Sequence, residues 1–90
     1  MSKLNTAIVT GGGRGIGKET AILLSKNGLN VVICSRTQKE IDSTVKEIKS
    51  FGNGRIIGRK CDVSVSSQVN TLVKDILEIY GRLDILINNA

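Results

Sequence analysis

The stretch TGGGRGIGKET (residues 10–20) places glycines and basic residues directly behind the apolar run Ala7–Val9. A strand that runs into glycines and then into a helix directs backbone N–H groups, and the positive end of the helix dipole, toward one point. Glycines let a ligand's phosphates approach the backbone, because no side chain stands in the way. The stretch therefore predicts a phosphate-binding loop.

The remainder of the chain alternates apolar strands with amphipathic helices. We expect strands at residues 6–9, 29–34, 56–61 and 84–87, and helices at residues 15–27, 37–51 and 64–80. The order βαβαβαβ, with right-handed crossovers, predicts an α/β fold in which helices cover both faces of a parallel sheet. The helix faces expected to meet the sheet are Ile16, Leu23 and Leu24; Ile41, Val45 and Ile48; and Val65, Val69, Leu72, Val73, Ile76 and Tyr80.

Residues at the expected helix ends suit their positions. Thr37 and Glu40 have the spacing of a capping box, and Ser64 is placed to cap the third helix. Glycines follow each helix and predict its end, with a left-handed cap at the first: Gly28, Gly52, Gly54 and Gly81.

Composition limits the classes of function. Ninety residues form one domain at most, and 40% hydrophobic with 23% charged residues is ordinary for a globular protein. No apolar run approaches the roughly 20 residues that span a bilayer, nor is there a signal-peptide segment, so we expect a cytoplasmic protein with no membrane contact. The net charge of +5 suits an anionic ligand. Because only Phe51 and Tyr80 could stack on bases, we expect no nucleic-acid partner.

The two cysteines, Cys34 and Cys61, each end an apolar run, and the chain has no histidine. This pattern argues against a zinc site and against a disulfide framework. We expect two buried structural thiols and no metal site.

Two templates compete for the glycine loop. GGRGIGK (residues 12–18) follows the pattern of a nucleoside-triphosphate loop, but Glu19 stands where a magnesium-binding Ser or Thr is required. The common dinucleotide fingerprint GxGxxG fits no register of these glycines. The pattern that fits is Thr10-Gly11-x-x-x-Gly15-x-Gly17. A nucleoside-triphosphate hydrolase remains as a remote alternative.

Three motifs in order resemble the short-chain dehydrogenase/reductase family: TGxxxGIG after the first strand, Asp62-Val63 after the third, and Asn88-Asn89-Ala90 after the fourth. The resemblance covers all 90 residues. It implies a Rossmann-type doubly wound sheet, of which this chain supplies the first four strands, with NAD or NADP bound at the carboxyl ends of the strands.

The resemblance also implies roles for single residues. In the loop, Gly11 would allow the sharp turn, Gly15 the approach of the pyrophosphate, and Gly17 the close packing of the helix, while Ile16 would donate a backbone N–H. Asp62 and the Val63 backbone would contact the adenine, Asn89 the ribose, and Asn88 would connect strands. The cofactor-binding residues expected are Thr10, Gly11, Gly13, Arg14, Gly15, Ile16, Gly17, Ser35, Arg36, Thr37, Asp62, Val63, Asn89 and Ala90.

The end of the second strand indicates which nicotinamide cofactor is preferred. NAD-specific sites place there a carboxylate that bonds the ribose hydroxyls. Here the residues are Cys34-Ser35-Arg36-Thr37, with no acid. Arg36, aided by Arg14 and the hydroxyls of Ser35 and Thr37, suits a 2′-phosphate. We therefore expect NADP rather than NAD.

In the family a serine, a Tyr-x-x-x-Lys pair and an asparagine perform the chemistry. Tyr80 is followed four residues later by Asp84, so no catalytic residue is assigned and Tyr80 is expected in the core. We expect an N-terminal part of a longer, homo-oligomeric enzyme that transfers hydride between NADPH and a ketone. The substrate stays open between 3-oxoacyl-acyl carrier protein and tropinone-type ketones, and a non-catalytic dinucleotide-binding module or redox sensor is the alternative. Alone, the chain is expected to be inactive, with an exposed outer edge on its fourth strand.

Overall fold

The computed structural model describes residues 5–11, 13, 15–50 and 55–88. Every strand and helix expected from the sequence is present in this part of the chain, with ends shifted by one or two residues. The elements are β1 (Thr6–Thr10), α1 (Gly15–Lys26), β2 (Asn30–Ser35), α2 (Gln38–Lys49), β3 (Ile56–Lys60), α3 (Ser66–Tyr80) and β4 (Ile85–Ile87). Phe51, Gly52 and Gly54 lie outside the described residues, and α2 ends at Lys49.

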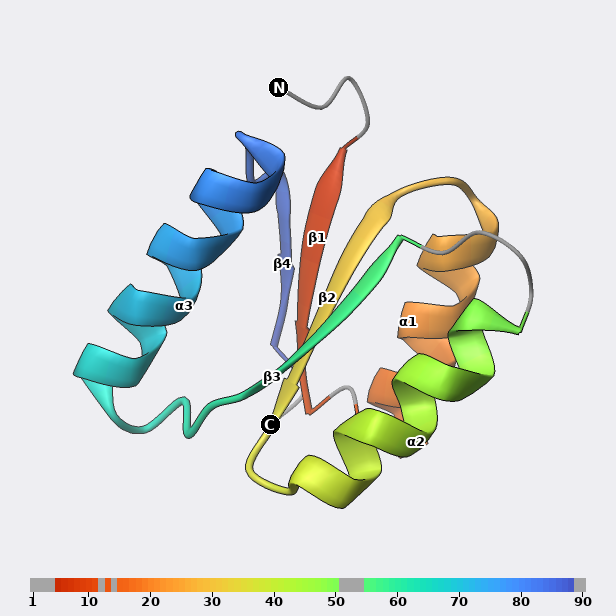
Figure 1. Cartoon of the computed structure of the whole chain (residues 1–90), viewed down its shortest axis with the longest axis horizontal. Coiled ribbons are helices and arrows are strands. Elements are labelled where there is room, and N and C mark those ends of the chain that lie inside the picture. The colour runs from red at the N-terminus through yellow and green to blue at the C-terminus, as the bar shows by residue number, and fades with distance from the viewer. Residues whose placement is uncertain (1–4, 12, 14, 51–54, 89–90) are drawn as a thin grey trace.

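The four strands form one parallel sheet in the order β3-β2-β1-β4 (Figure 1). β1 lies between β2 and β4, with Ile8 level with Val32 on one side and with Leu86 on the other. The chain therefore winds outward in one direction through β2 and β3 and then crosses β1 to form β4. This reversal beside β1 creates the topological switch point at which α/β sheets bind ligands.

Helices cover both faces of the sheet, as predicted: α1 and α2 lie on one face and α3 on the other (Figure 1). Alternate residues of each strand supply the two cores, since successive side chains point to opposite faces. The core under α1 and α2 contains Val9, Ala21, Val31, Ile33, Ile41, Ile48 and Ile56. The core under α3 contains Ile8, Val32, Cys34, Cys61, Leu72 and Ile76.

The expected apolar face of α1 is wrong. Ile16 and Leu23 are 77% and 61% exposed, whereas Gly17, Ala21 and Ser25 are buried. These three small residues recur every fourth position, so they share one face of the helix. Small side chains on that face let α1 lie close to the sheet. Leu24 is half-buried at the margin of the core.

The predicted helix starts are confirmed only in part. Thr37 is the N-cap of α2, as predicted, but it makes no side-chain capping bond. The N-cap of α3 is Val65 rather than Ser64, so that prediction is wrong. The backbone at both positions is extended, and the Ser64 hydroxyl bonds Asp62 instead. The glycine predictions hold at Gly28 and Gly81, whose φ angles are 85° and 77°.

Candidate functional site

The glycine loop leaves the centre of the sheet and opens into α1. Gly11 turns the chain at φ 66°, and its N–H donates to the Cys34 carbonyl at 2.9 Å, which joins the ends of β1 and β2. Gly15 has φ 59°, and a Cβ placed on it would meet nothing within 4 Å. Because the first N–H groups of a helix have no partner within the helix, the start of α1 presents donors to this open space.

A cleft of about 690 Å³ lies at the carboxyl ends of β1, β2 and β3. Most of the residues predicted from the sequence line it together: Gly11, Gly15, Ile16, Gly17, Ser35, Arg36, Thr37, Asp62 and Val63. Arg14, Asn89 and Ala90 lie outside the described residues. The fold thus brings the segments after three different strands to one site.

Thr10 and Gly13 do not line this cleft. Thr10 is buried, and its hydroxyl donates to Asn88 Oδ1 at 3.0 Å and to the Ile87 carbonyl at 3.3 Å. These bonds join the end of β1 to the end of β4 and confirm the expectation that Asn88 connects strands. Gly13 is buried against α2.

The segment that follows β3 places Asp62 on the wall of the cleft. Its Oδ1 accepts hydrogen bonds from the Ser64 hydroxyl at 2.7 Å and from the Ser64 N–H at 3.0 Å. These bonds hold the pKa of Asp62 below its ordinary value, and the Arg36 guanidinium lowers it further. Asp62 is therefore a carboxylate at neutral pH, and Arg36 acts on it from the end of β2.

The turn from β2 into α2 supplies another wall of the cleft. The Ser35 hydroxyl accepts a hydrogen bond from the Thr37 N–H at 3.2 Å, which shapes this turn, and Arg36 is exposed. Residues 34–37 contain no acid, as the sequence shows, but Glu40 also lines the cleft. Glu40 was not among the site residues predicted from the sequence. Its position in the first turn of α2, directly after β2, was the available signal.

Cys34 and Cys61 form part of the cleft wall and are 0% and 3% exposed. Burial raises the pKa of Cys34 to about 11, and the neighbouring Cys61 contributes to the shift. Burial, followed by the Asp62 carboxylate, also raises the pKa of Cys61. Both cysteines are buried in the core under α3, as predicted, and a raised pKa disfavours the reactive thiolate.

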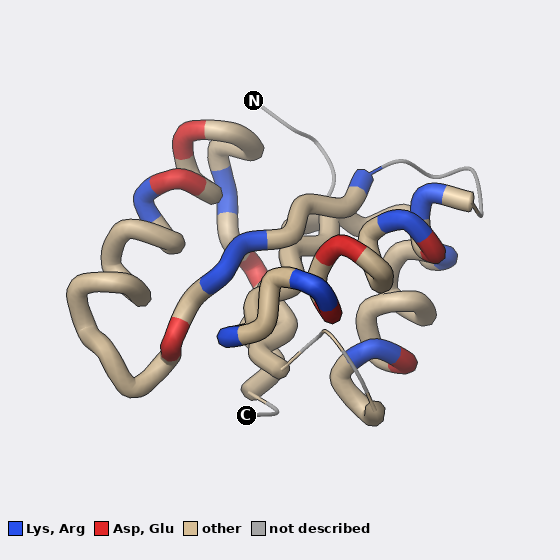
Figure 2. The backbone as a smooth tube through the Cα atoms, turned by 60° about the horizontal axis from the view of Figure 1, so that its bottom comes forward, with Lys and Arg blue, Asp and Glu red and all other residues tan. Residues whose placement is uncertain are grey.

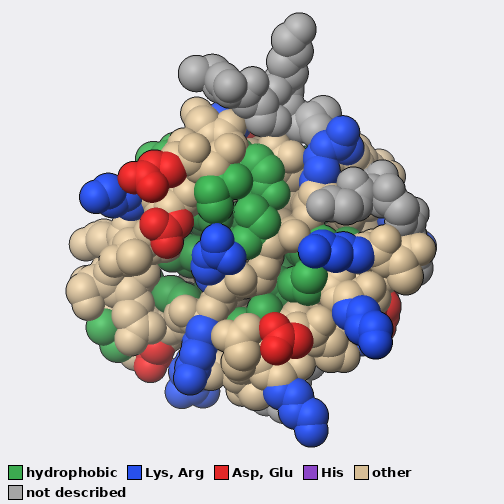
Figure 3. Space-filling model, viewed as in Figure 1, with side chains coloured by type: hydrophobic (Ala, Val, Ile, Leu, Met, Phe, Trp, Pro, Cys, Tyr) green, Lys and Arg blue, Asp and Glu red, His purple; other side chains and the backbone are tan. Residues whose placement is uncertain are grey.

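Charge is distributed over the whole molecule. Basic and acidic positions are interleaved along the helices (Figure 2), and Figure 3 shows Lys and Arg side chains among apolar and acidic ones on the face viewed there. Lys18, which a nucleoside-triphosphate loop would require at the phosphates, forms an ion pair with Glu47 of α2 at 2.9 Å. This pairing, together with Glu19, disfavours the triphosphate template.

Comparisons with known proteins agree with this geometry. The family model described as short chain dehydrogenase matches residues 5–90. The chain belongs to the short-chain dehydrogenase/reductase family. Among its relatives in this family, the short-chain reductase protein NovJ of Streptomyces niveus is 41% identical over the whole chain. The short-chain dehydrogenase/reductase homolog YusS of Bacillus subtilis is 42% identical, also over the whole chain.

Solved structures of short-chain dehydrogenases have the same fold. A variant actinorhodin polyketide ketoreductase with NADPH has a TM-score of 0.92 at 39% identity and is matched by all of this chain. A metagenomic short-chain oxidoreductase in complex with NADP has a TM-score of 0.90 at 35% identity over 96% of this chain. The chain spans 34% of NovJ, 35% of the ketoreductase, 38% of the metagenomic enzyme and 84% of YusS.

Two further observations concern the described part of this family member. None of its helices combines the length and apolarity that crossing a bilayer demands. Tyr80 is half-buried against the core under α3, as predicted, and burial raises its pKa despite opposing effects of Arg59 and Arg55. This environment is the opposite of the one that activates a catalytic tyrosine.

Proposed function

We propose that this chain forms the dinucleotide-binding part of an NADP-dependent short-chain reductase. The observation that carries the proposal is the cleft that joins the start of α1, Arg36 at the end of β2 and Asp62 after β3. Dinucleotides need these three elements in this order: donors for a pyrophosphate, a group for the adenosine ribose and an acceptor for the adenine.

The residues fit such a cofactor. The open space over Gly15 admits a pyrophosphate to the backbone, where any side chain would occupy that space. Arg36 would hold a 2′-phosphate with a planar fork of donors, and Thr37, whose side chain makes no capping bond, can donate its hydroxyl. In the described part of the chain, Asp62 Oδ2 has no donor, so it can accept a hydrogen bond from an adenine amino group.

The proposed reaction is hydride transfer between NADPH and a ketone or secondary alcohol. The bound nicotinamide would supply the hydride, and this chain's residues would bind and orient the cofactor. The NADPH-bound ketoreductase among the structural neighbours supports this class of substrate. An acyl-carrier-bound 3-oxoacyl group and a small free ketone both belong to the class. Because Tyr80 packs in the core, we assign cofactor binding and not proton transfer to these residues.

Calorimetric titration of the chain with NADPH and with NADH tests the proposal. We expect tighter binding of NADPH. Replacing Arg36 with Leu should weaken NADPH binding by roughly 10- to 100-fold, because one group that donates charge-assisted hydrogen bonds contributes about this much affinity. NADH binding should be unchanged. Arg55→Leu is the matched control, since Arg55 is an exposed arginine that does not line the cleft. Tighter binding of NADH, unaffected by Arg36→Leu, would overturn the proposal.

A further inference from the structure

A hydrogen bond connects Gly13 of the glycine loop to the middle of α2. The Thr44 hydroxyl donates to the Gly13 carbonyl at 3.0 Å, and both residues are buried. They lie 31 positions apart in the chain. A threonine within a helix commonly bonds the carbonyl one turn earlier in its own helix, as Thr20 and Thr71 do here. Thr44 instead directs its hydroxyl out of α2 and into the loop.

Gly13 also packs tightly against the first turn of α2. A Cβ placed on Gly13 would lie 2.9 Å from Glu40 Cβ and 3.2 Å from Glu40 Oε2. It would also lie 3.5 Å from Ser35 Cβ, at the end of β2. The Gly13 backbone is therefore held between α2 and the end of β2, with no room for a side chain at this position. The hydrogen bond and the close packing are independent observations of one contact.

The bond is directional in an otherwise apolar setting. On α2, Thr44 is flanked by Ile41 and Ile48, which are 1% and 0% exposed. A buried hydroxyl in such surroundings costs stability unless it is paired, and valine has nearly the same shape. Packing alone would be satisfied by valine, so the specific contribution of threonine is to fix the position of the Gly13 carbonyl.

We propose that Thr44 is a positioning residue for dinucleotide binding, through which α2 sets the conformation of the glycine loop. This inference rests on the proposed function. The segment that leads into α2 carries Arg36 and Thr37 at the ribose end of the cleft, and the body of α2 holds Gly13 two residues before the pyrophosphate-binding start of α1. The two halves of the proposed cofactor site thereby both adjoin α2.

The test compares Thr44→Val with Thr44→Ser in the full chain, each titrated with NADPH and with NADH. The pyrophosphate is common to both nucleotides. Thr44→Val should therefore weaken the binding of NADPH and of NADH by the same factor, roughly tenfold, and leave the ratio of the two dissociation constants unchanged. Thr44→Ser keeps the hydroxyl and should bind both within about twofold of the original chain. A purely structural role would reduce thermal stability without changing the affinity of the folded molecules.

Thr71→Val is the control, because Thr71 is exposed on α3 and bonds its own helix. If Thr44→Val does not fold, Thr44→Ala removes the same hydroxyl without a new methyl group beside the loop. The inference would be overturned if a folded Thr44→Val or Thr44→Ala variant bound both nucleotides with affinities within about twofold of those of the original chain. A preference for NADH in the original chain would overturn the proposed NADP dependence and leave the Thr44 comparison intact. A chain that binds neither nucleotide overturns both.

Discussion

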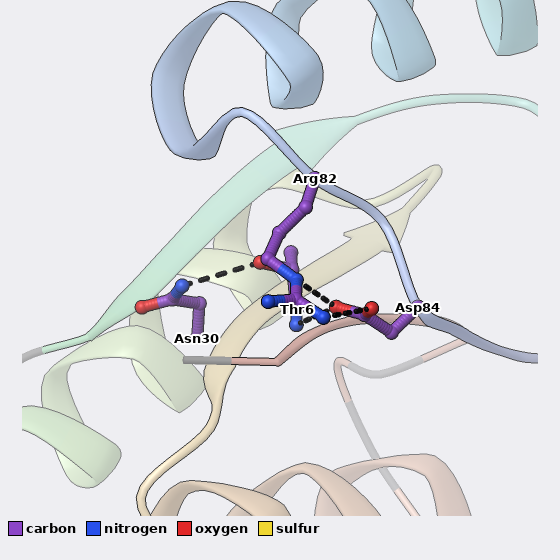
Figure 4. Close-up of polar contacts among 4 residues, drawn as sticks. All are labelled: Thr6, Asn30, Arg82 and Asp84. Atoms are coloured by element: carbon purple, nitrogen blue, oxygen red, sulfur yellow. Dashed lines mark hydrogen bonds and ion pairs between the residues drawn. The ribbon is translucent and has the colours of Figure 1, made fainter. Parts of the chain in front are cut away.

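The two ends of the parallel sheet use strand-terminal residues in different ways. At the amino end, Asp84 Oδ2 accepts hydrogen bonds from the Thr6 N–H and from Arg82 Nε, both at 2.8 Å (Figure 4). Arg82 Nη2 reaches Asp84 Oδ1 at 2.6 Å, and the Asn30 amide donates to the Thr6 hydroxyl at 3.2 Å (Figure 4). These side chains satisfy one another and the backbone and connect β1, β2 and the start of β4.

At the carboxyl end, Thr10 and Asn88 bond each other between β1 and β4, but glycines follow β1. Gly11 and Gly15 turn the chain through positive φ angles, and the space over Gly15 stays open. Asp62, Arg36 and Glu40 are among the polar residues that line the cleft there. Polar groups that bond one another within the protein stabilise the fold. Backbone N–H donors that face open space can instead bind an anion. Substitutions at the two ends should therefore separate stability from binding.

The largest expected effect is the loss of cofactor binding in Gly15→Val. The side chain would fill the open space over the loop, and we expect NADPH affinity to fall by about 100-fold or more, measured by calorimetry. Gly28→Val is a closely matched control. Gly28 also has a positive φ, and a Cβ placed on it would likewise meet nothing within 4 Å, but it lies at the far end of α1. Both variants place a β-branched residue at a positive φ, with backbone strain of the order of 1–2 kcal/mol. Equal affinities in the two would refute the role given to the loop.

The second effect concerns thiol chemistry at the carboxyl end. The pKa of Cys34 is raised from 9.0 to about 11 in the folded chain, so near pH 8 its thiolate fraction should be about 100-fold lower than in the unfolded chain. Alkylation of Cys34, followed by mass spectrometry of its peptide, should be slower by at least that factor without urea than with it. Because folding raises the pKa of Cys34, the contribution of its neutral thiol to the free energy of unfolding should be complete below pH 9. That contribution should decline as the pH rises toward 11. Equal alkylation rates in both conditions would contradict this.

The third effect is on stability at the amino end. Asn30→Ala removes the amide that donates to the buried Thr6 hydroxyl, and leaving that hydroxyl without this donor should cost about 1–3 kcal/mol in the free energy of unfolding. Asn27→Ala is the control, because the Asn27 amide bonds the Leu23 carbonyl on the exposed surface. Urea denaturation measures the difference between the two. NADPH affinity should stay unchanged in both, and a loss in Asn30→Ala would show that the two ends are coupled.

The same contrast explains what the sequence could predict. Each element was predicted because strands buried on both faces read as continuous apolar runs, whereas the helices carry an apolar stripe with a 3.6-residue period. The loop glycines and Arg36 were predicted because each lies next to a strand end, and Asp62 was predicted because its motif resembles that of the family. The face of α1 was misjudged because close packing selected Gly17, Ala21 and Ser25 over larger apolar residues. Glu40 and Thr44 were missed because their roles depend on how α2 packs against the loop.

The smallest effect is expected for Asp84→Asn, and its pH dependence distinguishes it from the others. The Arg82 side chain and then the Thr6 N–H hold the pKa of Asp84 below its ordinary value of 3.8. A lowered pKa in the folded state means that Asp84 contributes stability above about pH 4, which is lost as the pH falls through its folded pKa. The pair is accessible to water, so its contribution at neutral pH is small. Thermal melts should thus show Asp84→Asn slightly below the original chain at about pH 7, with the gap closing toward about pH 2. A gap that persists at low pH would mean that the amide disturbs the strand ends by its shape and not by its missing charge.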